Sequence, residues 1–251
     1  MAYKIAVLVK QVPDLNAMRI DSATGKPIFG GQMVISSYDD YAIEEAILLK
    51  EKHGADVTVI AAGPSGAKDA VTRALAMGAD NGVLIEMAAN DVDTRVLARV
   101  LAEQLSGGGF DIILTGQSSD DTGTGQIGPQ VAELLGLPSV SSVIGLDANG
   151  STLTLLRDTE DGKQKVSTET PVLVMASSGL NEPRYPSLKG IMAAKKKPLE
   201  TIKVDVSVPH DISWGEPYRE ERAAKGTIVA DVPASDAAAQ LVAWLREKKL
   251  V

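Results

Sequence analysis

Short apolar runs alternate with amphipathic stretches over the first half of the chain. Strands are predicted at residues 5–9, 57–61, 82–85 and 112–115. Helices are predicted between them at residues 38–52, from Gly63-Pro64-Ser65 to Ala76, at residues 92–105, and in a stretch ending near Leu135-Gly136. This alternation of strand and helix predicts a mostly parallel sheet with right-handed crossovers.

The pattern changes after Pro138. Residues 140–144, 152–156 and 166–168 alternate around turn signals at Asn149-Gly150 and Asp161-Gly162, which predicts antiparallel hairpin strands appended to the sheet. Residues 172–176 predict one more buried strand. Turn signals between residues 18 and 35 predict an excursion, such as a hairpin.

The last third of the chain has weak periodicity. Residues 198–232 contain several prolines and predict an extended arm, and residues 234–248 predict a final helix. The expected fold class is therefore α/β, with a doubly wound, mostly parallel, Rossmann-like sheet, appended antiparallel strands and a C-terminal arm. The expected domains are residues 1–197, including a loop at 180–197, and residues 198–251.

Composition narrows the class of protein. Apolar residues make up 44% of the 251 residues but aromatics only 4%, so the core must consist of Ala, Val, Ile and Leu, as suits a parallel sheet covered by helices. The net charge of −8 argues against broad binding to nucleic acid or anionic membrane. The absence of cysteine excludes disulfides, thiolate catalysis and cysteine-held iron–sulfur clusters.

No apolar stretch reaches the roughly 18 residues needed to span a bilayer. The N-terminal apolar run is short and is interpreted as the first strand rather than a signal peptide. We therefore expect a soluble cytoplasmic protein.

Residues 116–128 (GQSSDDTGTGQIG) form a polar, glycine-rich loop between a predicted strand and a predicted helix. A helix N-terminus presents unpaired N–H groups, and glycines let the backbone approach an anion, so the loop suits phosphate. Gly123, Gly125 and Gly128 also match the dinucleotide fingerprint, although they begin several residues after the strand. The alternative is a solvated loop with a helix cap.

Other strand ends meet at the same predicted edge of the sheet. Residues 8–11, 36–39 and 61–63 would surround an adenosine there, since ligands of parallel sheets bind at the carboxyl ends of the strands. Ordinary turn chemistry is the alternative interpretation of these residues.

Residues 180–197 (LNEPRYPSLKGIMAAKKK) combine a rigid, proline-containing start with a basic end. Leu188 is an apolar residue among polar neighbours, and Lys195 and Lys196 belong to a lysine run. One interpretation is a docking loop with an apolar anchor in a basic rim. The other is a surface loop with a solvated charge run.

Catalytic and metal-binding patterns are lacking. His53 and His210 have no suitable Ser or Asp arrangement and are interpreted as surface or hydrogen-bonded histidines, and no metal-ligand spacing occurs. Glu44 and Glu45 occupy adjacent helical positions, so at most one of them is expected to face a site. No catalytic residue is predicted.

The run from Asn181 to Lys197 closely resembles the signature of electron-transfer flavoprotein β-subunits. The resemblance extends in order along most of the chain, through residues 10–14 (KQVPD), 38–46 (YDDYAIEEA), 73–80 (RALAMGAD) and 122–128. It implies a non-enzymatic electron carrier that forms a heterodimer with an α-subunit. That partner would hold most of a redox FAD, while this chain would bury an adenine nucleotide.

The resemblance also implies roles for individual residues. Carried over one by one, the nucleotide pocket would use Leu8, Ser36, Ser37, Tyr38, Asp39, Ala62, Asp121, Thr122, Gly123, Thr124, Gly125 and Gln126. Leu188 would be the anchor inserted into a flavin-dependent dehydrogenase such as an acyl-CoA dehydrogenase, with Lys195 and Lys196 beside it. The C-terminal arm and helix would contact the α-subunit, and the electrons would pass on to the respiratory chain or another acceptor.

Three alternatives stay open. The nucleotide is AMP in conventional members of the family, which we favour, and a second FAD in electron-bifurcating members. An NAD-dependent Rossmann dehydrogenase would rest on the glycines at 123, 125 and 128. An ATP-binding stress-protein-like module would need neither the lysine-rich loop nor the long arm.

Overall fold

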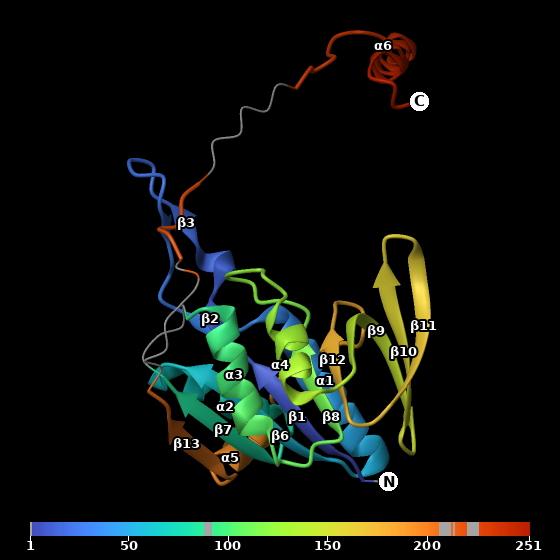
Figure 1. Cartoon of the computed structure of the whole chain (residues 1–251). Helices are drawn as coiled ribbons and strands as arrows, with labels where there is room; N and C mark the ends of the chain where they lie inside the picture. The colour runs from blue at the N-terminus through green and yellow to red at the C-terminus, as the bar shows by residue number, and fades with distance from the viewer. Residues whose placement is uncertain (1, 88–91, 206–211, 213, 220–225) are drawn as a thin grey trace. The chain divides into compact units, whose positions relative to one another are not determined.

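The structure, a computed structural model, describes residues 2–87, 92–205, 212, 214–219 and 226–251 (Figure 1). The chain divides into two compact units, residues 1–217 and residues 218–251, which are described separately. Residue His210 and parts of the expected arm lie outside the described residues.

The first unit is built on one nine-stranded sheet. Its strands lie side by side in the order β11 (Gly162–Glu169), β10 (Thr152–Thr159), β9 (Ser139–Asn149), β12 (Val172–Ala176), β8 (Ile112–Gly116), β1 (Lys4–Val9), β6 (Asp56–Gly63), β7 (Asn81–Glu86) and β13 (Leu199–Lys203). Pairing is parallel from β12 to β13 and antiparallel between β9, β10 and β11. The predicted α/β class with appended antiparallel strands is confirmed.

Helices cover both faces of the sheet (Figure 1). The core on one face includes side chains of α1 (Ser37–His53), α2 (Lys68–Met77) and α5 (Leu188–Ala194), and the core on the other includes α3 (Thr94–Leu105) and α4 (Ile127–Leu135). Strand β1 shows why its sequence suits this position: Ile5, Val7 and Val9 enter the first core, whereas Ala6 and Leu8 enter the second. A strand buried on both faces needs such an apolar run.

Helix α1 illustrates how the local sequence sets an element. Acidic Asp39 and Asp40 lie in its first turn and basic residues in its last turn, an arrangement that complements the helix dipole. Gly54 ends the helix in the left-handed conformation (φ 73°) and donates its N–H to the carbonyl of Lys50. A 3₁₀ turn, η2 (Ser65–Ala67), precedes α2, as the Gly63-Pro64-Ser65 signal predicts.

The excursion predicted near residues 18–35 is real. It contains a turn of 3₁₀ helix, η1 (Leu15–Ala17), and the two-stranded hairpin of β3 (Arg19–Ile20) and β4 (Pro27–Ile28). A second small sheet pairs β2 (Gln11–Pro13) with β5 (Met33–Ile35), and β2 is not among the strands that the sequence predicts. Strand β2 forms because its backbone pairs with the distant β5, and no local sequence pattern indicates this pairing.

Two further expectations are wrong in detail. Residues 199–203, expected in an extended arm, form β13, which pairs with β7 at the edge of the sheet. An edge strand has only one neighbour, so its sequence need not be apolar. Strand β9, expected to be purely antiparallel, begins parallel to β12 and shifts register near Ser142 (φ 57°) before it pairs with β10.

The second unit contains α6 (Ala234–Glu247), close to the predicted helix, and none of its side chains is buried. The unit boundary after residue 217 differs in place from the expected domain boundary after residue 197, and the functional division of the chain stays a prediction. Within the described ranges, no helix combines the length and apolar character that crossing a bilayer requires.

Candidate functional site

A cavity of about 780 Å³, counted with the open space at its mouth, lies at the carboxyl ends of the central strands. Strands β1 and β8 lie next to each other in the sheet, although β6 and β7 come between them in the chain. The strand order therefore reverses between β1 and β8, and ligands of open α/β sheets bind in the crevice at such a point.

The apolar wall of the cavity comes from the sheet and from α3. Leu8 and Ile60 contribute from β1 and β6, Ala62 follows on β6, and Leu97 contributes from α3. Polar residues also line the cavity, in the loop between β8 and α4 and at Thr94. A largely apolar lining with a few polar groups is typical of a binding site for a small organic ligand.

The loop at residues 117–126 is shaped by its glycines. Gly123 and Gly125 both adopt the left-handed conformation (φ 62°), which other residues rarely adopt. Within the loop, the hydroxyls of Ser119 and Thr122 are 2.8 Å apart and share a hydrogen bond. Thr122 and Thr124 line the cavity, so their side chains are available to a ligand.

Helix α4 begins at the same loop. Its N-cap residue, Gln126, makes no side-chain hydrogen bond to the first turn of the helix and bonds to the hydroxyl of Thr94 instead (2.9 Å). The N-terminal N–H groups of α4 therefore lack a side-chain cap, and Gln126, Ile127 and Gly128 line the cavity. An uncapped helix N-terminus attracts an anion such as phosphate.

Asp39 fastens the first turn of α1 to the strand ends. Its carboxylate accepts the backbone N–H of Lys10 (2.7 Å) and of Gly116 (3.0 Å), which end β1 and β8. Burial raises the pKa of Asp39 to about 7 against the effect of these two donors, and Asp40 and Asp120 push the pKa in the same upward direction.

Ser36, Ser37 and Tyr38 do not line the cavity. The backbone N–H and hydroxyl of Ser37 donate to Asp120 (2.8 and 2.7 Å), and the hydroxyl of Ser36 accepts from the N–H of Asp120 (3.1 Å). These hydrogen bonds connect the start of α1 to the glycine-rich loop, so these residues support the loop without lining the cavity.

Asp121 also lies outside the cavity lining and forms an ion pair with Lys10 (2.7 Å). Gly123 is the remaining expected residue that does not line the cavity. The structure thus brings seven of the expected residues to the cavity wall and leaves five in supporting positions; the seven are Leu8, Asp39, Ala62, Thr122, Thr124, Gly125 and Gln126.

Sequence reasoning missed several residues of the wall. Val92, Thr94 and Leu97 belong to the start of α3 or precede it, and Trp214 comes from the segment after β13. No local signal identifies them, because α3 follows β7 in the chain and β7 does not line the cavity. These side chains reach the site only through tertiary packing, in which α3 enters the same apolar core as β1, β6 and β8.

The segment at residues 180–197 forms a second candidate site. Ser187 caps α5 by accepting the N–H of Gly190 (3.0 Å), and Leu188 begins the helix with its side chain 83% exposed. Met192, one turn further, is 71% exposed. Lys195 and Lys196 are exposed beside them. The expected arrangement of an apolar side chain beside basic ones is therefore present.

The described residues offer no metal site: none of their His, Cys, Asp and Glu side chains gather in groups of three or more that could hold an ion. His53 lies against Tyr3 in an edge-to-face ring contact, with ring centroids 5.4 Å apart. This position is consistent with a packing role.

Comparison with known proteins places the chain among carriers of electrons. The family model described as "Electron transfer flavoprotein domain" matches residues 29–207. The "Electron transfer flavoprotein subunit beta" of Bacillus subtilis is 45% identical over 178 residues, which cover 70% of this chain and 69% of the relative.

Two further relatives carry the same description. The protein of Clostridium acetobutylicum is 37% identical over 257 aligned residues, which cover 98% of this chain and 99% of the relative. That of Syntrophomonas wolfei is 43% identical over 80% of each chain. The similarity therefore includes both the glycine-rich loop and the segment at residues 180–197.

Proposed function

The chain belongs to the electron transfer flavoprotein family as a β-subunit, an electron carrier subunit, and from this premise we propose that its cavity binds an adenine nucleotide, AMP. The observation that carries the proposal is the uncapped N-terminus of α4, which lines a cavity that also has an apolar lining. The phosphate would meet the helix N-terminus, and the adenosine would lie against Leu8 and Ala62.

The glycine-rich loop would complete the phosphate site. Thr122 and Thr124 would donate their hydroxyls, and the left-handed glycines let the backbone come close to the phosphate. Asp39 and Ser36, Ser37 and Tyr38 would act by holding the loop and the strand ends in place. Asp121 and Gly123 would support the loop in the same way.

A second FAD in place of AMP is the alternative that fits the same cavity. A NAD-dependent dehydrogenase is disfavoured, because β8 ends at Gly116 whereas the first glycine of the fingerprint is Gly123. In the dinucleotide fold the glycines follow the strand directly.

We further propose a heterodimer with an α-subunit that holds most of the redox FAD. When bound, the flavin supplies the electron-transfer chemistry. Exposed apolar side chains on α6, including Leu241, Val242 and Trp244, support a role of the C-terminal arm in contacting that subunit. The cytoplasmic location expected from the sequence stays a prediction.

The test is to co-express this chain with its α-subunit, purify the complex and release its nucleotides with acid for identification by mass. One FAD and one AMP per heterodimer is the expected result. Two FAD per heterodimer would instead support the electron-bifurcating alternative. Release of NAD, or a stable colourless monomer that ignores the α-subunit, would contradict the proposal.

We also propose that Leu188 docks into the donor, a flavin-dependent dehydrogenase such as an acyl-CoA dehydrogenase, with Lys195 and Lys196 at the rim. Burying a Leu side chain contributes about 1.5–3 kcal/mol, so Leu188→Ala should weaken docking by roughly 10- to 100-fold. The measurement is the KM for the heterodimer as electron acceptor of an acyl-CoA dehydrogenase, with flavin content as the control. An unchanged KM would exclude the anchor role.

A further inference from the structure

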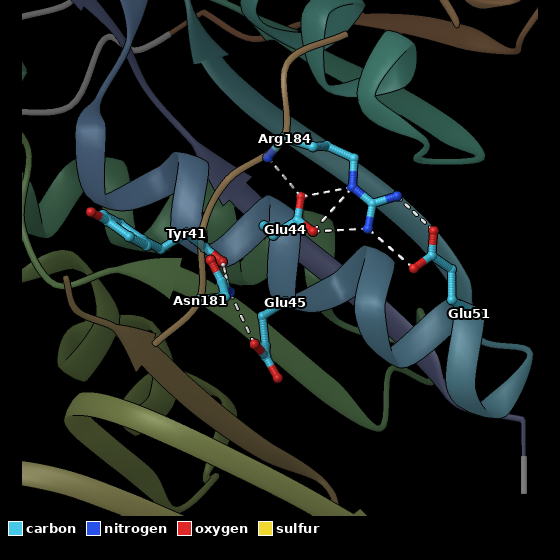
Figure 2. Close-up of polar contacts among 6 residues, drawn as sticks. All are labelled: Tyr41, Glu44, Glu45, Glu51, Asn181 and Arg184. Atoms are coloured by element: carbon cyan, nitrogen blue, oxygen red, sulfur yellow. Dashed lines mark hydrogen bonds and ion pairs between the residues drawn. The ribbon is translucent and has the colours of Figure 1, made fainter. Parts of the chain in front are cut away.

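The segment that leads to α5 is fastened to α1 by one arginine (Figure 2). The guanidinium of Arg184 donates to Glu44 (2.8–3.0 Å) and, from its other side, to Glu51 (2.6 and 3.1 Å). The backbone N–H of Arg184 donates to Glu44 as well (3.1 Å). The planar fork of arginine can hold two carboxylates in fixed directions at once, which a lysine cannot do.

A second contact supports the same segment. The side-chain amide of Asn181 donates to the carbonyl of Tyr41 (3.0 Å) and to the carboxylate of Glu45 (2.9 Å). Neither Glu44 nor Glu45 lines the cavity, in keeping with the expectation that at most one of them faces a site. Both are buried, and each holds one residue of the segment, because the segment crosses α1 and meets both sides of one turn.

Helix α5 is fastened at its other end to α2. The amine of Lys197 donates to the carbonyls of Leu75 (2.9 Å) and Ala79 (2.5 Å) at the end of α2. Gly190 packs against the carbonyl of Ala76 so closely that a Cβ there would overlap with it. The exposed side chains of α5 are thus carried by a short helix that is attached before its first residue and after its last.

The charges make the Arg184 contact persistent. Glu44 is only 3% exposed, and a buried carboxylate without a partner is strongly destabilising. Arg184 supplies the positive charge that Glu44 needs, and its own side chain stays partly in contact with solvent (34% exposed). The segment cannot leave α1 without exposing or stranding this carboxylate.

We propose that Arg184 is a positioning residue for docking: held by Glu44 and Glu51, it fixes the segment before α5 and so presents Leu188 in a preorganised position. A preorganised anchor binds more tightly than a flexible one, because less conformational entropy is lost on binding. The inference rests on the proposed docking role of Leu188. It assigns Glu44 and Glu51 of α1 a function in electron transfer that acts through Arg184.

The test uses the co-expressed heterodimer and an acyl-CoA dehydrogenase as donor. Arg184→Lys keeps the charge beside Glu44 but loses the two-carboxylate fork, and the pair Arg184→Gln with Glu44→Gln removes the charges together. We expect the KM for the heterodimer to rise about tenfold with kcat unchanged, because docking and not the chemical step is weakened. Hydrogen exchange of the α5 amides should speed up, while amides of the central strands keep their protection.

Two further variants separate the explanations. Lys52 lies on α1, as Glu44 and Glu51 do, and forms an exposed ion pair with Asp147 of β9 (3.0 Å). Lys52→Gln breaks this ion pair and should change neither the KM nor the hydrogen exchange of α5. In the Leu188→Ala background, the effect of Arg184→Lys on KM should largely disappear, since both residues act on one contact.

The outcomes are distinct. Full additivity of Arg184→Lys and Leu188→Ala, or unchanged KM and α5 exchange in both Arg184 variants, would overturn the positioning role while leaving the docking role intact. An unaltered KM in Leu188→Ala alone would overturn the docking role, and the positioning role with it.

Discussion

The cavity and the proposed docking segment, residues 180–197, both depend on α1, but they are built in opposite ways. The cavity is concave and is formed by the ends of parallel strands, glycines and short polar side chains. The docking segment is irregular, projects Leu188 into solvent, and is held by long charged side chains to two helices. The first turn of α1 serves the cavity through Asp39, and later turns serve the segment through Glu44 and Glu51.

This difference teaches how one helix can support two sites without merging them. The cavity follows from the sheet, because any doubly wound fold has a crevice where the strand order reverses. The docking segment takes its position from particular side-chain contacts, namely the ion pairs of Arg184 and the hydrogen bonds of Asn181 and Lys197. The two sites should therefore fail separately when each is disturbed by a single substitution.

The largest effect is expected from Gly116→Ala, which attacks the cavity. A Cβ at Gly116 would overlap with the carboxylate of Asp39 and lie 2.9 Å from its backbone nitrogen and 2.8 Å from the Cβ of Tyr38. Forcing apart α1 and β8 should cost on the order of 3 kcal/mol of stability and abolish nucleotide retention. The measurement is the nucleotide content and thermal midpoint of the heterodimer.

Gly66→Ala is the matched control for this variant. A Cβ at Gly66 would meet only the side chain of Gln11, at an ordinary 3.7 Å, so nucleotide content and midpoint should stay at parental values. A Gly116→Ala complex with full nucleotide content and an unchanged midpoint would show that the contact between α1 and β8 is dispensable.

A smaller effect on the cavity side is expected from pH. Burial raises the pKa of Asp39 to about 7 from its ordinary value of 3.8, so between these pH values the folded protein binds a proton that the unfolded chain has released. The associated stability is complete below the unfolded pKa and is lost as pH rises through 7, by about 2 kcal/mol between pH 5.5 and 8. Asp39→Asn removes this contribution.

The measurement is the thermal midpoint of parent and Asp39→Asn heterodimers across that pH range. The parent's midpoint minus the variant's should fall as pH rises, whatever the absolute stability of the variant. A constant difference, or one that grows with pH, would mean that Asp39 is ionised throughout.

The smallest effect is expected from Gly190→Ala, which attacks the docking segment. The added Cβ overlaps with the carbonyl of Ala76, so α5 must shift away from α2 and carry Leu188 with it. We expect docking to weaken about tenfold, or roughly 1.4 kcal/mol, while AMP and flavin are retained. The measurement is the KM for the heterodimer as acceptor of an acyl-CoA dehydrogenase.

Gly66→Ala again provides the control, with an unchanged KM expected. The independence of the two regions would be contradicted if Gly190→Ala released the nucleotide. It would also be contradicted if Gly116→Ala altered docking in heterodimers that retain their nucleotide. Either result would mean that α1 transmits disturbance from one site to the other.

Much of the fold was predictable because it depends on local periodicity. The run at residues 5–9 and the amphipathic stretch at 38–52 correspond to β1 and α1 within a residue or two. Strand β13 was not predictable in this way, since Leu199–Lys203 is an exposed edge strand whose pairing with β7 comes from distant residues. The same holds for β2, which needs β5 as its partner.

The candidate site divides along the same line. Leu8, Ala62 and the threonines of the glycine-rich loop were found because they lie at predicted strand and helix ends. Trp214 and the residues of α3 were missed, because tertiary contacts between distant parts of the chain bring them to the cavity.

The sequence by itself determined the alternation of the central strands and helices, the glycine-rich loop, and the family through the segment at residues 180–197. The tertiary structure alone decided that Asp39 joins β1 to β8 and that Glu44 and Glu45 both hold that segment. The reason is physical: propensity and periodicity act between neighbours in the chain, whereas a buried carboxylate takes whichever donor the fold brings to it. For Glu44 that donor is Arg184, which lies 140 residues further along the chain.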